Sequence, residues 1–506
     1  MSNNEFLTEN GANRVVIVAW DGATPLGVGR KQIESNLDFN ACGIRALPDG
    51  FFDQIPLEKK LDKKILAELD ISDNIKDIIM KRYDGVIRER REKFLRQIPN
   101  VKACGQVQQG ERGNLVPLSD KDLTTMVNEL AGKEIPFKHQ TTDGKWLNDA
   151  TRPISQLLRK LERYQKMGYL SAAQLVKGLT DSGFDLTVNS EGSNAAIILG
   201  SGIGGVQTYQ ENTFRISRAM PPKPTFIPNS IVGAVMAINC LTGIRGKTYV
   251  LSTACASGLH ASYETFLNLR SGYEELDWAL SGGIETALTM NSLAGFAKMP
   301  ALSTRKPDKA SIPFAAERDG FVLAEGSITM LFTTLKYAKE KELPILAEVA
   351  GGAASQDCYP HPTAPHPDGN GLYLAMRDSL YRSKILIPDV DLVVAHGTST
   401  PLGDPAEAVA IRNLYGTDVR VTSNKGDYGH MIGASGPAGI VTALKAINDG
   451  TVCLVPSTKD EIDKNINDLN ICTYDGDNSI DARVVQVNAA GFGGQNCSLV
   501  IKKYEP

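Results

Sequence analysis

The sequence lacks any segment that would carry the chain into or across a membrane. Nowhere do about 18 apolar residues follow one another, the length that a membrane-spanning helix needs. The first ten residues are polar and have neither the basic region nor the apolar region of a secretory signal. We therefore expect a soluble, cytoplasmic protein with no membrane span.

Cysteine is scarce and scattered. The eight cysteines include no Cys-x-x-Cys pair and share no zinc-type spacing with the six histidines. This usage is typical of reduced thiols in the cytosol. The sequence therefore predicts no structural metal, and nothing in it calls for a cofactor.

An excess of positive charge is also missing. The net charge is -4, so no overall basic field would hold nucleic acid or an anionic membrane. The basic residues between 81 and 96 are interleaved with acidic ones. They form either a patch for an acidic carrier or, the reading we favour, an ordinary solvated helix face.

The length and the apolar content indicate a large protein with at least two core units. The chain has 506 residues, of which 42% are hydrophobic. Strand candidates alternate with helical runs, which is typical of α/β architecture with buried sheets. They lie at 14–19, 194–199, 248–252, 278–281, 326–332, 346–350, 391–395, 420–423, 483–488 and 497–501. Amphipathic surface helices are expected at 57–69 and 75–83, a helix at 164–179, and a polar tract at 106–149.

A glycine motif at 200–205, Gly-Ser-Gly-Ile-Gly-Gly, matches the fingerprint of dinucleotide binding. The confirming context is missing, because the chain continues into a proline-rich segment at 219–224 and not into a second strand that ends in an acidic residue. We do not expect NAD or FAD to bind there.

Cys255 lies among small residues, Ser-Thr-Ala-Cys-Ala-Ser-Gly, between a strand candidate and a helical segment. A thiol at a helix N-terminus is favoured as the nucleophilic thiolate, and tiny neighbours leave room for a bulky electrophile. An isolated cysteine is more often a small buried apolar residue. The chemistry of other residues must decide between the two readings.

Two histidines have matching surroundings. His396 and His430 each follow a strand candidate and enter a Gly-rich loop before a helix, and α/β folds place their chemistry at such strand ends. A lone histidine is more often structural, but two of them with a matching thiol favour a catalytic site. Zinc binding by this set is disfavoured, since the residues are not closely paired.

Four ordered motifs resemble those of β-ketoacyl-acyl-carrier-protein synthases of the elongating, Cys-His-His type. They are 252–258 around the cysteine, 396–407 (His-Gly-Thr-Ser-Thr-Pro-Leu-Gly-Asp-Pro-Ala-Glu), Lys425 with Gly429-His430, and 488–496 (Asn-Ala-Ala-Gly-Phe-Gly-Gly-Gln-Asn). The resemblance covers 13–45 and about 160–506, but not most of 46–160.

The resemblance implies a thiolase-like fold. Two similar α/β halves would form a layered αβαβα core, with residues 1–335 carrying Cys255 and residues 336–506 carrying His396 and His430. An enlarged helical insertion would occupy about 46–160. The family also implies a homodimer and an acyl carrier protein as partner.

The resemblance further implies a decarboxylative condensation. Cys255 would accept an acyl group, with the backbone N–H groups of Cys255 and Phe492 as the oxyanion hole. Neutral His396 and His430 would then stabilise the enolate formed as a malonyl thioester loses CO2.

The remaining family positions are supporting ones. An ion pair between Lys425 and Glu407 would orient the histidines, with an ordinary buried pair as the alternative. Thr398, Thr400 and Thr363 would hold pantetheine, although the first two would serve equally well as helix caps. Ala490 stands where the family commonly has Phe, which predicts a looser pocket mouth beside the Phe492 gate.

Two alternatives stay open. An initiating synthase or a thiolase would use acyl-CoA, but initiating synthases usually carry Cys-His-Asn. A non-catalytic partner that only shapes chain length would have lost the nucleophile, whereas Cys255 is present.

Overall fold

The computed structural model describes residues 5–8, 11–38, 42–47, 101–109, 116–131, 138–140, 146–148, 160–186, 194–225 and 229–506. The helices expected at 57–69 and 75–83 and the basic stretch at 81–96 lie outside the described residues. The helix expected at 164–179 is confirmed, as part of α6 (Arg163–Asp181).

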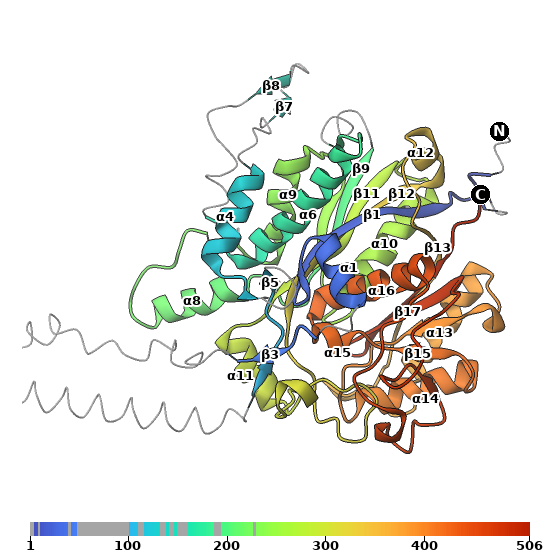
Figure 1. Ribbon diagram of the computed structural model, residues 1–506. Coiled ribbons are helices and arrows are strands. Elements are labelled where there is room, and N and C mark those ends of the chain that lie inside the picture. The colour runs from blue at the N-terminus through green and yellow to red at the C-terminus, as the bar shows by residue number, and fades with distance from the viewer. Residues whose placement is uncertain are drawn as a thin grey trace, which may run out of the picture.

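A large mixed sheet runs through the molecule (Figure 1). Its strand order is β10-β9-β11-β12-β1-β13-β18-β17-β14-β15-β16, with β2 paired to β1. The bounds are β1 Val15–Thr24, β2 Gly27–Val28, β9 Ala195–Gly200, β10 Thr248–Leu251, β11 Trp278–Thr286, β12 Glu325–Thr334, β13 Ala347–Gln356, β14 Leu392–Val394, β15 Arg420–Thr422, β16 Asn470–Ile471, β17 Val484–Gly491 and β18 Gln495–Lys502. Every strand candidate in the sequence overlaps one of these strands.

The strand pattern occurs twice. In the first half, β10, β9 and β11 are parallel, and β12 and β1 follow antiparallel. In the second half, β15, β14 and β17 are parallel, and β18 and β13 follow antiparallel. A short antiparallel contact between β1 and β13 joins the halves. The two halves thus share one topology, as the resemblance implied.

Helices form three layers around the two half-sheets. Between the half-sheets lie α10 (Ser257–Ser271) and α16 (Ser435–Asp449), which contact strands of both. The outer face of the first half is covered by α6 and α9 (Ala234–Thr242), and that of the second by α13 (Asn370–Ser383) and α14 (Gly403–Tyr415). Separate apolar clusters fill these interfaces. The layering is therefore αβαβα.

Small residues let the two central helices approach closely. A Cβ added at Gly258 in α10 would lie 2.2 Å from the Gly433 carbonyl oxygen, and one at Gly436 would lie 2.6 Å from the Leu259 nitrogen. Both positions therefore require glycine. The contact brings the N-terminus of α10, next to Cys255, against the N-terminus of α16, next to His430.

The remaining described elements are peripheral or short. The helices are α1 Arg30–Asp38, α4 Asp120–Ala131, α8 Val206–Ile216, α11 Met290–Lys298, α12 Leu335–Glu340 and α15 Lys425–Tyr428. The 3-10 turns are Ile231–Gly233, Pro307–Lys309, Ile387–Asp389, Ile432–Ala434 and Lys459–Glu461. The paired short strands are β3 Arg45–Ala46 with β4 Ala103–Cys104, β5 Gln108–Gln109 with β6 Val116–Pro117, and β7 Lys138–Gln140 with β8 Trp146–Asn148.

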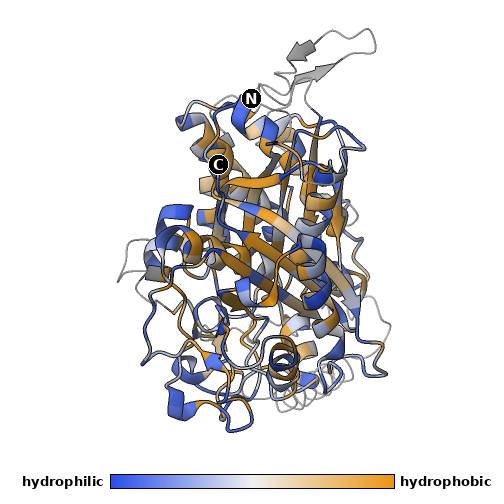
Figure 2. Cartoon of the chain, turned by 90° about the vertical axis from the view of Figure 1, so that its right-hand side faces the viewer, coloured by the Kyte–Doolittle hydropathy of each residue, from blue (hydrophilic) through white to orange (hydrophobic). Residues whose placement is uncertain are grey.

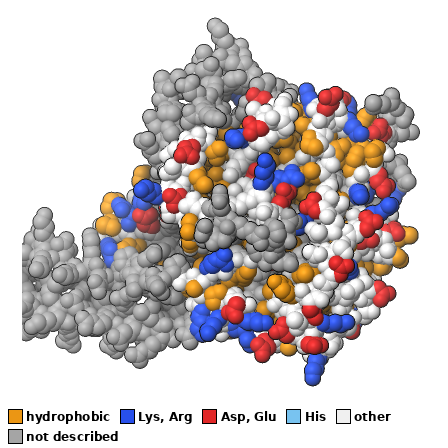
Figure 3. Space-filling view, in the orientation of Figure 1, with side chains coloured by type: hydrophobic (Ala, Val, Ile, Leu, Met, Phe, Trp, Pro, Cys, Tyr) orange, Lys and Arg blue, Asp and Glu red, His pale blue; other side chains and the backbone are white. Residues whose placement is uncertain are grey.

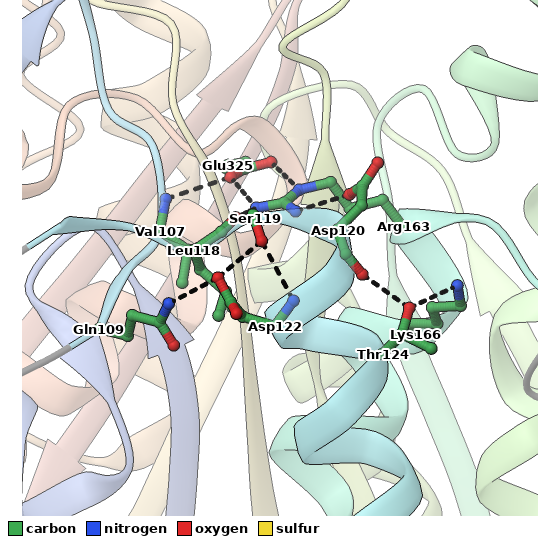
Figure 4. Close-up of polar contacts among 10 residues, drawn as sticks. All are labelled: Val107, Gln109, Leu118, Ser119, Asp120, Asp122, Thr124, Arg163, Lys166 and Glu325. Carbon is green, nitrogen blue, oxygen red and sulfur yellow. Dashed lines mark hydrogen bonds and ion pairs between the residues drawn. The ribbon is translucent and has the colours of Figure 1, made fainter.

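Residues 101–109 and 116–131 contact a buried ion pair of the first half (Figure 4). Arg163 at the start of α6 donates to both oxygens of Glu325 in β12, at 2.6 and 2.7 Å, and to Asp120 at 2.8 Å. Glu325 also accepts from the Val107 N–H at 3.1 Å. Gly105 bridges to the segment before β12. The described part of this region is thus built into the core.

Hydrophobic residues concentrate in the central strands, and polar ones on the outer helices and loops (Figure 2). On the face seen in Figure 3, acidic and basic side chains are interspersed. Among the described residues, no helix has both the length and the apolar character to cross a membrane.

Candidate active site

Cys255 lies between β10 and α10, as expected, and Ala256, the N-cap residue of α10, follows it. Ala254, the residue before Cys255, has a left-handed φ of 50°, which strains a non-glycine residue and turns the chain sharply into the helix. The hydroxyl of Ser257 donates to the Ala254 carbonyl, at 2.5 Å, and accepts from the Thr253 N–H, at 2.8 Å. This turn holds the thiol at one end of a cavity.

The thiol environment differs from the sequence-based expectation. The backbone N–H groups of Phe492 and Cys255 and the charge of Lys425 do lower the pKa of the Cys255 thiol. Burial outweighs them and raises this pKa to about 12, with a further contribution from the Glu285 carboxylate. The helix end thus favours the thiolate, as the sequence suggested, but the burial of Cys255, which depends on the rest of the fold, has the larger effect on the pKa.

His396 and His430 lie together, although 34 positions separate them in the sequence. His396 follows β14 and His430 follows β15. Their rings meet edge to face, with centroids 5.3 Å apart and planes at 84°. Burial and the nearby Lys425 charge hold both pKa values down, that of His430 to about 3 and that of His396 well below 6.5. Both imidazoles are therefore neutral at physiological pH.

One backbone contact and two ring contacts hold His430. Its backbone N–H donates to the Val322 carbonyl, at 2.7 Å. Its ring stands edge-on to Phe321, with centroids 5.2 Å apart. Its Nδ1 lies 2.9 Å from the hydroxyl of Ser435, the first residue of α16. With that hydroxyl as donor, the imidazole proton resides on Nε2.

Glu407 supports the other histidine through the backbone. Its carboxylate accepts from the N–H groups of His396 and Gly397, at 2.8 and 2.7 Å. Lys425 is buried, which lowers its pKa to about 8, and the Glu407 charge raises that pKa through space. Within the described part of the chain, no ion pair joins Lys425 to Glu407. The expected salt bridge is thus a longer-range attraction.

A cavity of about 710 Å³ connects these groups. Cys255, His396 and His430 line it together, and Glu407 also reaches its wall. Most of the remaining lining is apolar, which suits an acyl chain. The apolar members include Met299, Ala301, Phe321, Leu372, Leu402 and Phe492.

The three threonines expected to hold pantetheine all line this cavity. The hydroxyls of Thr398 and Thr400 lie 3.2 Å apart, and that of Thr400 also accepts from the Gly403 N–H at the start of α14. Thr400 therefore caps the N-terminus of α14 and also lines the cavity. Thr363 sits in the proline-rich loop after β13, where its N–H donates to His361 Nδ1, at 3.2 Å.

Phe492 and Ala490 occupy neighbouring parts of the cavity wall. The Phe492 ring packs at 53° to Phe296, with centroids 6.3 Å apart. Ala490, in β17, presents only a methyl group to the cavity. The expected looser wall at this position remains a prediction about acyl choice.

The backbone N–H groups of the glycine motif at 200–205 are bound by a side chain of the protein itself. The side chain of Glu285 accepts hydrogen bonds from the N–H groups of Gly202, Ile203 and Gly204, at 2.7 to 3.2 Å. A phosphate would need the same donors. The glycines therefore serve an internal carboxylate. Among the described residues, no group of three His, Cys, Asp or Glu side chains could hold a metal ion.

Sequence reasoning missed Ser435 and Glu285. A serine that opens a helix looks like any other N-terminal serine, and its histidine partner follows only from the turn between them. Glu285 could have been identified from the sequence. A carboxylate at the end of the apolar strand 278–286 is expected to be buried and therefore to need hydrogen-bond donors.

Comparison with known proteins shows the family of the chain. The chain matches the family model for the β-ketoacyl synthase N-terminal domain over 120–338 and the one for the C-terminal domain over 346–458. The chain therefore belongs to the β-ketoacyl synthase family, and it is an acyl-transferring enzyme. The first match begins at 120, within the region that the sequence resemblance left uncovered.

Two curated relatives indicate the kind of synthase. The 3-oxoacyl-[acyl-carrier-protein] synthase 2 of Vibrio harveyi is 34% identical over 357 residues, which is 68% of this chain and 83% of the relative. The protein of the same name from Staphylococcus aureus strain COL is 32% identical over 411 residues, 78% of this chain and 97% of the relative.

Solved structures share the fold. A β-ketoacyl synthase from Burkholderia phymatum matches with a TM-score of 0.71 at 22% identity, covering 97% of this chain and 100% of that one. A type II polyketide synthase acyl-carrier protein in complex with its ketosynthase matches at 0.72 and 20% identity, covering 97% and 99%.

Proposed function

We propose that this protein joins an acyl group carried on Cys255 to a malonyl unit on an acyl carrier protein, with loss of CO2, in fatty acid or polyketide-like synthesis. The observation that carries the proposal is the convergence of Cys255, His396 and His430 on one apolar cavity. The nucleophile comes from residues 1–335, and both histidines come from residues 336–506.

In the first half-reaction, the Cys255 sulfur attacks the carbonyl carbon of an acyl thioester. The N–H groups of Cys255 and Phe492 are the donors available to the oxyanion, and each such donor contributes on the order of 3 kcal/mol. The carrier thiol leaves with the proton that Cys255 gave up. Because burial raises the pKa of Cys255, this deprotonation accompanies the attack.

In the second half-reaction, a malonyl thioester enters and its C–C bond to the carboxylate breaks. CO2 leaves, and the electron pair remains on the thioester as an enolate. The neutral His396 and His430 donate hydrogen bonds to the enolate oxygen, where charge develops. The carbanion then attacks the acyl carbon on Cys255. Collapse gives the β-ketoacyl carrier and a Cys255 thiolate, which takes up a proton.

The same proposal extends to the surroundings of the site. Thr363, Thr398 and Thr400 line the cavity, and in this proposal they hold the pantetheine arm. We further propose a homodimer in the cytoplasm, as is usual for this family. Acyl-CoA as the donor of the first acyl group is the second candidate, since pantetheine is common to both donors.

Intact-mass analysis tests the proposal. The protein is incubated with a panel of acyl carriers and acyl-CoAs, and adducts are measured on wild type and on Cys255→Ala. We expect an acyl adduct on wild type that disappears in the variant, and the donor that gives it identifies the substrate. No adduct from any donor would reject the proposal in favour of a non-catalytic subunit.

A further inference from the structure

Glu285 lies at the end of β11, fully buried, and its carboxylate binds backbone from both halves of the molecule. From the first half it accepts from the Gly202, Ile203 and Gly204 N–H groups. From the second half it accepts from the Gly433 N–H, at 3.3 Å. The Ser201 hydroxyl completes the set, at 3.4 Å. A buried carboxylate with this many donors is costly to disturb.

The two loops that Glu285 joins are the neighbours of the reacting groups. A Cβ at Gly202 would lie 3.0 Å from the carbonyl oxygen of Ala254, which precedes the nucleophile. It would also lie 2.5 Å from the side chain of Ile432, two residues after His430. Ile432 has a φ of 44°, so this turn is held in a strained conformation. The carboxylate therefore binds the loops that lie next to the two reacting groups.

The second half has a matching arrangement. There the loop after β14, the strand between β15 and β17, directs the N–H groups of His396 and Gly397 at Glu407. In the first half, the loop after β9, the strand between β10 and β11, directs its N–H groups at Glu285. In each half the loop after the corresponding strand thus surrounds an internal carboxylate. The first of these loops lies against Ala254 and Ile432, and the second contains His396.

We propose that Glu285 is a positioning residue that sets the separation of Cys255 and His430 by binding backbone N–H groups from the loop beside each. The inference rests on the proposed function. Glu285 does not line the cavity, so it acts through these loops and not on the substrate.

The charge of Glu285 supplies an independent readout. Its negative charge raises the pKa values of Cys255 and Tyr164, whereas Lys425 lowers that of Cys255. Glu162 faces the same tyrosine. Burial raises the pKa of Glu285 itself to about 7, and the N–H groups oppose this shift. Removal of the Glu285 charge will therefore lower the pKa of Cys255. The same change weakens the hydrogen bonds that hold the two loops, so the pKa and the loop geometry are affected separately.

The test compares Glu285→Gln and Glu285→Asp with wild type in condensation kinetics and in Cys255 alkylation by iodoacetamide as a function of pH. Glu285→Gln should lower the kcat of condensation by about tenfold or more, with the KM for the malonyl carrier little changed, because a buried N–H loses its acceptor. Its alkylation profile should move to lower pH. Glu285→Asp keeps the negative charge, but its side chain is too short to bind the N–H groups of both loops. It should therefore lower kcat and keep the wild-type alkylation profile.

The matched control is Glu348→Gln, which removes a buried carboxylate of β13 that pairs with Arg14 and Lys502. It should leave kcat and the alkylation profile unchanged, and circular dichroism confirms that every variant is folded. Unchanged kcat in both Glu285 variants, or a rise in KM alone, would overturn the proposal. If wild type itself condenses nothing, the proposed function fails, and an unshifted alkylation profile in Glu285→Gln would then reject the Glu285 assignment separately.

Discussion

The imidazole rings of His396 and His430 meet edge to face with their centroids 5.3 Å apart, and burial keeps both neutral. Two neutral rings can both donate hydrogen bonds, whereas two charged rings would repel each other. In the proposed mechanism both rings donate to the enolate oxygen, and Cys255, which lines the same cavity, holds the acyl group.

The hydroxyl of Ser435 should orient His430. Ser435→Ala removes the partner of His430 Nδ1, which frees the ring to turn and to change tautomer. We expect condensation to slow by about fivefold to tenfold, the worth of one hydrogen bond of about 1 kcal/mol. The measurement is kcat for condensation. Ser435→Thr keeps the hydroxyl and should restore most of the rate, and an Ala variant at the wild-type rate would contradict the assignment.

The depressed pKa of His430 should appear in stability against pH. The folded pKa is about 3, against an ordinary value of 6.5. Below pH 6.5 His430 is protonated in the unfolded chain but stays neutral in the folded chain. Falling pH therefore destabilises the native state by up to about 1.4 kcal/mol per pH unit.

Buried carboxyls such as Glu285 and Asp404 have raised pKa values, so their protonation stabilises the native state as the pH falls. The contribution of His430 is therefore isolated by comparing wild type with a variant that lacks it. The free energy of unfolding of wild type minus that of His430→Asn, from urea titrations, should shrink steadily between pH 6.5 and 4.5. A difference that does not change with pH would show that His430 titrates normally.

The buried pair of Arg163 and Glu325 should stabilise the attachment of residues 101–109 and 116–131. Arg163→Met leaves the buried Glu325 carboxylate without its cation, and we expect a loss of about 3 to 5 kcal/mol in the free energy of unfolding. Arg412→Met is the matched control, because its pair with Asp468 is more exposed and should contribute less than about 1 kcal/mol. Equal losses in the two variants, measured by urea titration, would refute the prediction.

Ala490 should influence which acyl chains are accepted. Ala490→Phe places a ring in the cavity wall beside the gate, so we expect the profile of acyl-transfer rates to shift toward shorter chains. The rates are measured for wild type and variant across a series of acyl donors. An unchanged chain-length profile would remove Ala490 from the determinants of specificity.

Much of the fold could be predicted because its signals are local. Buried parallel strands appear as apolar runs, and the reacting residues follow such runs, so the strand-end positions of Cys255, His396 and His430 were readable. The resemblance added the pairing of the halves. Depth of burial is not local, since it depends on the opposite half of the molecule.

For that reason the raised pKa of Cys255 and the through-space relation of Lys425 to Glu407 were not anticipated. The same applies to Glu285 and Ser435, whose partners are brought close by turns. The polar tract at 106–149 was expected to cover or flank the core. Arg163 binds Leu118 and Asp120 of this tract, a contact that no periodicity in the tract indicates.

The most direct test of the account is a single-turnover experiment with the double variant His396→Ala/His430→Ala, followed by intact mass of both enzyme and carrier. With an acyl donor and malonyl carrier present, the account predicts that the acyl adduct accumulates on Cys255 while the malonyl carrier keeps its carboxyl group. Consumption of the malonyl carrier at the wild-type rate, or failure of Cys255 to become acylated, would contradict the division of labour between the thiol and the two histidines.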